Sequence, residues 1–150
     1  MIDLSIAIVT YNNSEEIRET ITSVLNAIPH EYSYKLYIID NASQDSTVEI
    51  TKSISDDIEI ISRNVNNGFG AGHNVILDKI ASRYHFVVNP DILIENKEQI
   101  SRMISFFDSH PKVGMIAPLL LNPDHSIQYL CKRNPTVFDM LIRRFSPNLF

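Results

Sequence analysis

The stretch LSIAIVTYNN, residues 4–13, indicates from the start of the chain which class of fold to expect. Its first six residues form an almost unbroken apolar run, which is typical of a strand covered on both faces. Polar residues follow at once. Apolar residues then recur at helical spacing, at Ile17, Ile21, Val24, Leu25 and Ile28. A buried strand that leads into an amphipathic helix is the first unit of a parallel α/β sheet.

The same alternation continues along the chain. Further strands are predicted at KLYIID (35–40), IEII (58–61), YHFVV (84–88) and VGMIAP (113–118). Helices are predicted between them, in DSTVEITKSI (45–54), around Ile76, Leu77 and Ile80, and along Ile100, Met103, Ile104 and Phe107. This pattern predicts a mostly parallel, doubly wound sheet with helices on both faces. Ligands bind such sheets beyond the carboxyl ends of the strands.

Helix caps account for several of the polar residues that follow these strands. Asn13 and Glu16 have the spacing of a capping box for the first helix, and Ser46 and Glu49 have the same spacing for the second. Asp45 is also a good cap residue. We therefore expect structural roles for Asn13, Asp45 and Ser46.

Composition excludes several classes of protein. The 150 residues are 44% hydrophobic, which suits one domain with a real core, and the formal net charge of −5 disfavours nonspecific binding of nucleic acid. Cys131 is the single cysteine, so a disulfide framework is excluded and a reducing, cytoplasmic compartment fits. No apolar run is long enough to span a membrane, and the N-terminus is predicted to be a strand rather than a signal peptide.

The strand ends carry the candidate binding residues. Tyr11 follows the first strand, and Asp40 directly ends the second, too early to cap the helix that starts near Ser46. An aromatic ring beside a carboxylate can recognise a nucleotide base, because the ring stacks on the base while the carboxylate accepts one of its N–H groups. We therefore favour a functional role for Asp40.

A glycine-rich turn, NNGFGAGHN (66–74), follows the third predicted strand. It is not the dinucleotide-binding fingerprint, because it lacks the last glycine of that motif and does not follow the first strand. Gly68, Gly70 and Gly72 allow a backbone to approach a ligand closely, and an irregular loop that needs positive φ angles is the structural alternative.

The tripeptide Asn-Pro-Asp occurs twice. Asp124 lies between an apolar run and an alternating one, where Pro123 and Asp124 have ordinary turn chemistry. Asp91 instead follows the buried strand YHFVV at the ligand-binding edge. One carboxylate beside an amide suits a Mg²⁺ or Mn²⁺ ion that takes its other ligands from phosphates and water. We predict a turn at Asp124 and a site at Asp91.

Five segments together resemble the family 2 glycosyltransferases of the GT-A fold, and in particular their bacterial rhamnosyltransferase-like branch. They are SIAIVTYN (5–12), IIDNASQDST (38–47), RNVNNGFGAGHN (63–74), VVNPD (87–91) and GMIAPLLLNPDHSIQ (114–128). The resemblance runs from about residue 4 to residue 135. It implies a nucleotide-sugar-binding GT-A domain in residues 1–135 and the start of an acceptor-side segment in residues 136–150.

The resemblance also implies roles for individual residues. Thr10, Tyr11 and Asn12 would line the pocket for the base, where Asp40 and Asn41 bind the nucleotide. Gly68, Phe69, Gly72 and Asn74 would shape the donor site near ribose and diphosphate. Asn89 and Asp91 stand where the family has its D-x-D motif, with Asp91 as the ligand of the metal ion.

The activity implied is inverting transfer of a sugar, rhamnose in that branch, from a UDP- or dTDP-linked donor to a glycan or lipid-linked acceptor. The resemblance implies a catalytic base in a later segment, and no candidate occurs before Phe150, so we interpret the chain as the donor-binding half of a longer enzyme. A sugar nucleotidyltransferase is one alternative, although TYNN lacks the glycine-rich, basic loop that it would need. A non-catalytic nucleotide-sugar-binding module is the other.

The tail TVFDMLIRRFSPNLF (136–150) has apolar residues at helical spacing, including Val137, Leu141 and Phe145, beside Arg143 and Arg144. Such a helix must bury its apolar face. We favour packing against the rest of the enzyme over contact with the cytoplasmic face of a membrane, and a homodimer is left open.

Overall fold

In a computed structural model the described residues are 2–96 and 98–128. They belong to two compact units, Met1–Lys112 and Val113–Phe150, and each unit is described by itself. The first unit contains the sheet and its helices. The second contains a short hairpin.

The first unit is built on a four-stranded parallel sheet with the order β3-β2-β1-β4. Its strands are β1 (Ile2–Thr10), β2 (Tyr34–Asp40), β3 (Glu59–Ser62) and β4 (Ser82–Val88). Its helices are α1 (Ile17–Ala27), α2 (Thr47–Lys52), α3 (Phe69–Asn74), the 3₁₀ helix η1 (Leu77–Lys79) and α4 (Glu98–Ser109). The predicted parallel α/β architecture is confirmed.

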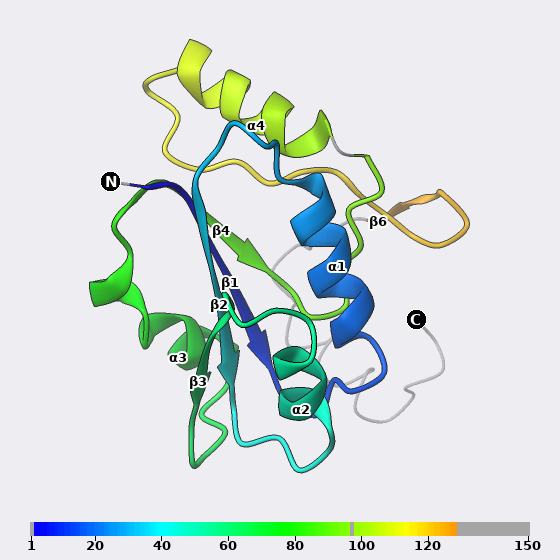
Figure 1. Ribbon diagram of the computed structural model, residues 1–150. Helices are drawn as coiled ribbons and strands as arrows, with labels where there is room; N and C mark the ends of the chain where they lie inside the picture. Colours follow the sequence, from blue (N-terminus) through cyan, green and yellow to red (C-terminus); the bar gives the residue numbers. More distant parts are fainter. Residues whose placement is uncertain (1, 97, 129–150) are drawn as a thin grey trace, which may run out of the picture. The chain divides into compact units, whose positions relative to one another are not determined.

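Strand β1 has a hydrophobic core on each face. Leu4, Ile6 and Ile8 are buried in a cluster with apolar residues of α1, β2 and α4. Ala7 and Val9 point to the opposite face and pack with Tyr37, Ile39 and Ile76. Figure 1 shows α1 and α2 on one side of the sheet and α3 on the other. Because each fully buried isoleucine or leucine contributes about 1.5–3 kcal/mol, the two clusters explain why this run of sequence is almost wholly apolar.

Both predicted capping boxes are wrong in detail. Helix α1 has Glu16 at its N-cap position without a side-chain cap bond, because the Asn13 side chain accepts instead from the N–H of Tyr11, at 2.9 Å. Ser46 does occupy the N-cap position of α2, but its hydroxyl makes no cap bond either. The Asp45 carboxylate accepts from the N–H of Thr47, at 3.0 Å, and so has the capping role.

Two predicted elements also differ. The helix expected around Ile76 to Ile80 begins earlier, inside the glycine-rich segment, and ends at Asn74, with only the short η1 after it. Residues 113–118 do not form the predicted fifth strand. A strand needs a hydrogen-bonded neighbour, and in the described part of the second unit the strands β5 (Leu120–Leu121) and β6 (Ile127–Gln128) pair with each other. The predicted tail helix lies outside the described residues.

Glycine is required at position 72 by packing rather than by conformation. A Cβ atom there would lie 2.7 Å and 2.9 Å from the two methyl carbons of Val9, which is buried in β1. At Gly70, in the same helix, a Cβ would meet nothing within 4 Å. Close approach of α3 to the sheet therefore depends on Gly72.

We predict opposite effects of one substitution at these two glycines. Gly72→Ala should lower the free energy of unfolding by about 1–3 kcal/mol, because the sheet cannot yield to the new methyl group. Gly70→Ala should leave it unchanged or raise it by up to about 1 kcal/mol, because alanine restricts the unfolded chain. Urea denaturation of both variants measures this. Equal destabilisation by the two would show that packing on Val9 is not the cause.

Candidate functional site

The carboxyl ends of β1 and β2 lie side by side and bring Thr10 and Asp40 together. Thr10 is paired with Asp40 in the strand register, and the Thr10 hydroxyl donates to Asp40 Oδ1 at 3.4 Å. The N–H of Ser43 also donates to the carboxylate, at 3.2 Å to Oδ2 and 3.3 Å to Oδ1. Asp40 is only 3% exposed. Its carboxylate is thus fixed by neutral donors, and no cation pairs with it among the described residues.

Asn12 fastens the loop after β1 to the loop after β2. Its N–H donates to the Ser43 hydroxyl at 2.9 Å, and its side-chain oxygen accepts from the N–H of Gln44 at 2.8 Å. Asn12 and Ala42 have φ angles of 54° and 65°, in the left-handed region that asparagine tolerates well and alanine does not. The two loops therefore form one cross-braced unit beyond the sheet.

Asp45 and Thr47 add a second set of bonds between these loops. Asp45 accepts from the N–H of Ser14 at 3.0 Å, while the Thr47 hydroxyl accepts from the N–H of Asn13 at 2.8 Å and donates to Asp45. Burial alone would raise the pKa of Asp45, but the hydrogen bonds from Thr47 and Ser14 outweigh it and lower the pKa to about 2. The Asp45 carboxylate is therefore ionised and serves the loop rather than a ligand.

Tyr11 differs from its neighbours because its side chain is not fixed to the loops. Its backbone is held by Asn13, whereas the residue is 46% exposed. An exposed ring next to the cross-braced loops is available to stack on a planar ligand. The pairing of the Tyr11 ring with the Asp40 carboxylate at a base stays a prediction, and no hydrogen bond joins the two side chains in the described part of the chain.

The glycine-rich turn is attached to the end of β2 through Asn41. This side chain is buried and donates from Nδ2 to the carbonyl oxygen of Gly68 at 3.2 Å. Gly68 has a φ of +86°, which a residue with a side chain rarely adopts, and it starts helix α3. Phe69 follows, half exposed, and Asn74 at the helix end is exposed. The predicted residues of the turn thus lie next to the predicted base pocket.

His73 of α3 was not singled out in the sequence. Neither ring nitrogen finds a hydrogen-bond partner in the described part of the chain, and both are buried, with Phe69 packed edge-on at 4.4 Å between ring centroids. Burial lowers the pKa of His73, and the neighbouring His85 lowers it further. The imidazole is therefore neutral at pH 7. Sequence could not reveal this, because it depends on how α3 lies on the sheet.

Asn89, Pro90 and Asp91 form a turn after β4 that is pinned to helix α1. The hydroxyl of the fully buried Thr20 donates to the carbonyl oxygen of Pro90 at 2.7 Å, and the N–H of Ile92 donates to the carbonyl oxygen of Asn89 at 3.4 Å. The Asp91 side chain is exposed and hydrogen-bonds to no described residue. Its carboxylate thus follows β4 at the sheet edge, with no partner on its oxygens in residues 2–96 and 98–128.

The donor set at this turn suits a hard cation that is only partly bound by protein. Asp91 offers carboxylate oxygens and Asn89 an amide oxygen, and within residues 2–96 and 98–128 no group of three acidic, histidine or cysteine side chains could hold a metal ion alone. Mg²⁺ and Mn²⁺ accept such sites when phosphates and water complete the coordination. The residues fit that role and do not fit a structural metal centre.

The second Asn-Pro-Asp forms the hairpin turn between β5 and β6, as predicted. The N–H of His125 donates to the carbonyl of Asn122 at 2.8 Å, and Asp124 accepts from the N–H of Ser126 at 3.0 Å and from its hydroxyl at 2.6 Å. These bonds from Ser126 lower the pKa of Asp124. Unlike Asp91, Asp124 uses its carboxylate within its own turn.

Comparison with known proteins agrees with this geometry. Residues 5–145 match the family described as glycosyl transferase family 2. The chain belongs to this family. The expected rhamnosyltransferase-like branch is a finer assignment that this match does not make.

Curated relatives of this family-2 chain include glycosyltransferases of bacteria. The SPbeta prophage-derived glycosyltransferase SunS of Bacillus subtilis (strain 168) is 28% identical over 109 residues, which cover 69% of this chain and 25% of SunS. The poly-beta-1,6-N-acetyl-D-glucosamine synthase of Staphylococcus epidermidis is 28% identical over 116 residues, 75% of this chain and 27% of the synthase. The chain thus spans about a quarter of the length of these relatives.

Solved structures share the GT-A fold. S. aureus TarS 1-349 in complex with UDP-GlcNAc matches with a TM-score of 0.63 and 23% identity, over 73% of this chain and 32% of that one. The mannosyltransferase PcManGT from Pyrobaculum calidifontis, in complex with GDP-Man and Mn²⁺, matches with a TM-score of 0.61 and 15% identity, over 71% and 34% of the two chains. Among the described residues, no helix is both long and apolar enough to cross a membrane.

We predict that Asp45 stabilises the cross-braced loops in a pH-dependent way. Asp45→Ala should lower the free energy of unfolding by about 1 kcal/mol at pH 7, the usual effect of losing a helix cap. Because folding lowers the pKa from 3.8 to about 2, the ionised carboxylate stabilises the fold above pH 4, and this contribution is lost as the pH falls toward 2.

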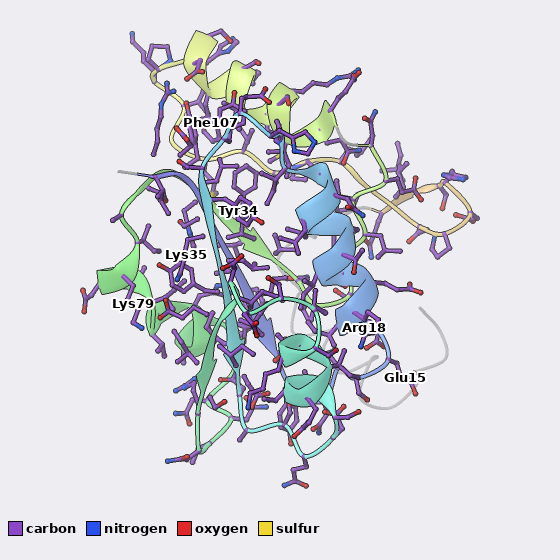
Figure 2. The ribbon with its side chains drawn as sticks, in the orientation of Figure 1. Glu15, Arg18, Tyr34, Lys35, Lys79 and Phe107 are labelled. Atoms are coloured by element: carbon purple, nitrogen blue, oxygen red, sulfur yellow. The ribbon has the colours of Figure 1, made fainter. Side chains whose placement is uncertain are left out.

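Urea titrations of the wild type and Asp45→Ala between pH 2 and pH 7 measure this difference. Glu15→Ala is the matched control, because Glu15 is an exposed carboxylate in the loop before α1 (Figure 2). A difference between the wild type and Asp45→Ala that stays constant over this range would contradict the role of the charge.

Proposed function

We propose that this chain binds the nucleotide-sugar donor of an inverting glycosyltransferase. The observation that carries the proposal is the buried Asp40 carboxylate, held by Thr10 and Ser43 at the carboxyl edge of a family-2 sheet. A buried carboxylate with unused acceptor capacity discriminates strongly for a ligand that supplies an N–H group. Accommodation of UDP-GlcNAc by the same fold in TarS supports a UDP-linked donor.

In this proposal the base lies over the ends of β1 and β2. Tyr11 stacks on it, Asp40 accepts one of its N–H groups, and Thr10, Asn12 and Asn41 shape the pocket. The hydrogen bonds between the two loops support this assignment, because a pocket that is already rigid loses little entropy when the ligand binds.

The ribose lies against the glycine-rich turn after β3, near Gly68, Phe69, Gly72 and Asn74, and the diphosphate and sugar extend from there toward Asn89 and Asp91 after β4. Asp91 and Asn89 would hold a Mg²⁺ or Mn²⁺ ion, which when bound neutralises charge on the departing diphosphate. The exposed, unbonded Asp91 carboxylate supports this role, and the Thr20 bond to Pro90 keeps the turn in place.

The acceptor reaction is assigned to the part of the enzyme beyond the donor site. A base there deprotonates the acceptor hydroxyl, which attacks the anomeric carbon opposite the diphosphate and inverts its configuration. Asp40 is buried and Asp91 is assigned to the cation, so neither serves as this base. We propose residues 1–135 as the donor-binding domain and residues 136–150 as the start of the acceptor-side segment.

The finer assignments rest on the sequence segments alone. We propose rhamnose as a transferred sugar, a UDP- or dTDP-linked donor, and a cell-surface glycan or lipid-linked acceptor reached at the cytoplasmic face of the membrane. The relationship to the poly-beta-1,6-N-acetyl-D-glucosamine synthase supports polysaccharide synthesis as the setting.

Nucleotide binding tests the function directly. UDP or dTDP at about 100 times its Kd should add about 2.7 kcal/mol to the free energy of unfolding, measured as a rise in Tm. Asp40→Ala should weaken that binding by about 1–3 kcal/mol, because a base N–H then loses its acceptor. If no nucleotide or nucleotide sugar stabilises the chain, the proposed function is wrong; unchanged affinity in Asp40→Ala removes Asp40 from the site.

The two Asn-Pro-Asp copies provide a matched pair for the metal ion. Asp91→Ala should abolish the gain in UDP affinity that Mn²⁺ produces, and it should leave the fold intact because the side chain makes no bond to the described residues. Asp124→Ala should keep the full Mn²⁺ effect. Calorimetric titration of UDP with and without Mn²⁺ measures both, and equal responses in the two variants would contradict the assignment of Asp91.

A further inference from the structure

Arg63 lies directly after β3 and bonds to Asp40, the last residue of β2, and to Asn41, which follows it. Its N–H donates to the carbonyl oxygen of Asp40 at 2.9 Å, and its guanidinium Nη1 donates to Asn41 Oδ1 at 2.8 Å. The residue is half-buried, and no carboxylate pairs with it among the described residues. Arg63 is thus a cation at the carboxyl edge of the sheet whose charge no carboxylate of the described part of the chain balances.

Most other basic side chains of the described chain have partners of their own. Lys35 and Lys79, labelled in Figure 2, both pair with Glu59. Arg102 pairs with Glu98 and Arg83 with Asp108, while Arg18 donates to the Ser53 hydroxyl. A guanidinium has five N–H donors, and the Asn41 bond uses one of those on Arg63. The remaining donors are available to a ligand.

We propose that Arg63 is a specificity-determining residue that donates to a carbonyl oxygen of the donor's base. This inference rests on the proposed function and adds to it a residue that contacts the base of the donor. The Asn41 bond fixes the guanidinium beside the pocket, and Asn41 in turn holds Gly68. Arg63 therefore connects the base pocket with the glycine-rich turn.

The order of the strands favours the base over the diphosphate as the group that Arg63 contacts. Arg63 follows β3 and Asp91 follows β4, at opposite edges of the order β3-β2-β1-β4. Three strand spacings of about 4.8 Å separate these edges by roughly 14 Å. A diphosphate held at Asp91 is therefore remote from Arg63, whereas Asp40, the proposed acceptor for the base, is bonded to the Arg63 backbone.

The chemistry of the pair selects a class of base. Two donors hold the Asp40 carboxylate, the Thr10 hydroxyl on Oδ1 and one Ser43 N–H shared between the two oxygens, so acceptor capacity remains for an N–H of the base. One acceptor beside a guanidinium donor matches the N–H and adjacent carbonyl of uracil or thymine. Cytosine replaces the carbonyl by an amino group, which the guanidinium repels.

Calorimetry with uridine, cytidine and UDP tests the proposal on the full chain. Arg63→Met should weaken uridine and UDP by the same factor, about 10-fold to 100-fold, which is the effect of losing a hydrogen bond to a charged group. It should also reduce the preference for uridine over cytidine. Arg63→Lys should recover only part of the affinity, because lysine lacks the planar fork. Arg102→Met, the same change on the exposed face of α4, should bind like the wild type.

Each other result has a distinct meaning. A loss confined to UDP would place the guanidinium on the diphosphate and overturn the proposal, and unchanged uridine binding in Arg63→Met would do the same. Equal losses of affinity for uridine and cytidine would show that Arg63 only supports the structure of the site, which would also overturn the proposal. If Arg63→Met fails to fold, Arg63→Lys provides the same comparison of uridine with cytidine. Absence of nucleotide binding in the wild type would overturn the proposed function and this inference with it.

Discussion

The double burial of β1 is the constraint on which the rest of the structure depends. β1 pairs with β2 on one side and β4 on the other, and both of its faces are covered by apolar side chains. A strand fixed in this way cannot slip in register without exposing its core residues. The positions of Thr10 at its end, and of the strand ends on either side, follow from that single fact.

Beyond the strand ends, hydrogen bonds from polar side chains hold the loops together in place of buried apolar contacts. Asn12, Ser43, Asp45 and Thr47 join two loops that contain little apolar surface, and Asn41 joins a third. Each hydrogen bond from a side chain to a backbone group stabilises a loop modestly. Together these bonds make the loops at the carboxyl edge of the sheet rigid. This explains why so many asparagines, serines and threonines gather in short stretches after apolar strands.

The sequence was sufficient where burial dominates. The predicted strands at 4–9 and 35–40 and the predicted helices containing Ile21 and Ile104 are all present. In each, the pattern of apolar residues is compatible with only one kind of element. The turn at Asp124 was also predictable from its residues. The segment 113–118 was not, since an apolar run becomes a strand only when a partner strand is available. The candidate site depends on hydrogen bonds between residues far apart in the sequence, such as Arg63 with Asn41 and Thr20 with Pro90. Local sequence patterns do not predict such bonds.

The bond between Thr20 and Pro90 has a mechanical consequence. It connects the middle of a helix whose apolar face is buried in the core to the turn after β4, so the turn cannot move outward unless a buried hydroxyl loses its partner. The turn after β4 is therefore held in place. Any rearrangement at this edge of the sheet has to come from side chains that are not held in this way, such as the 46% exposed ring of Tyr11.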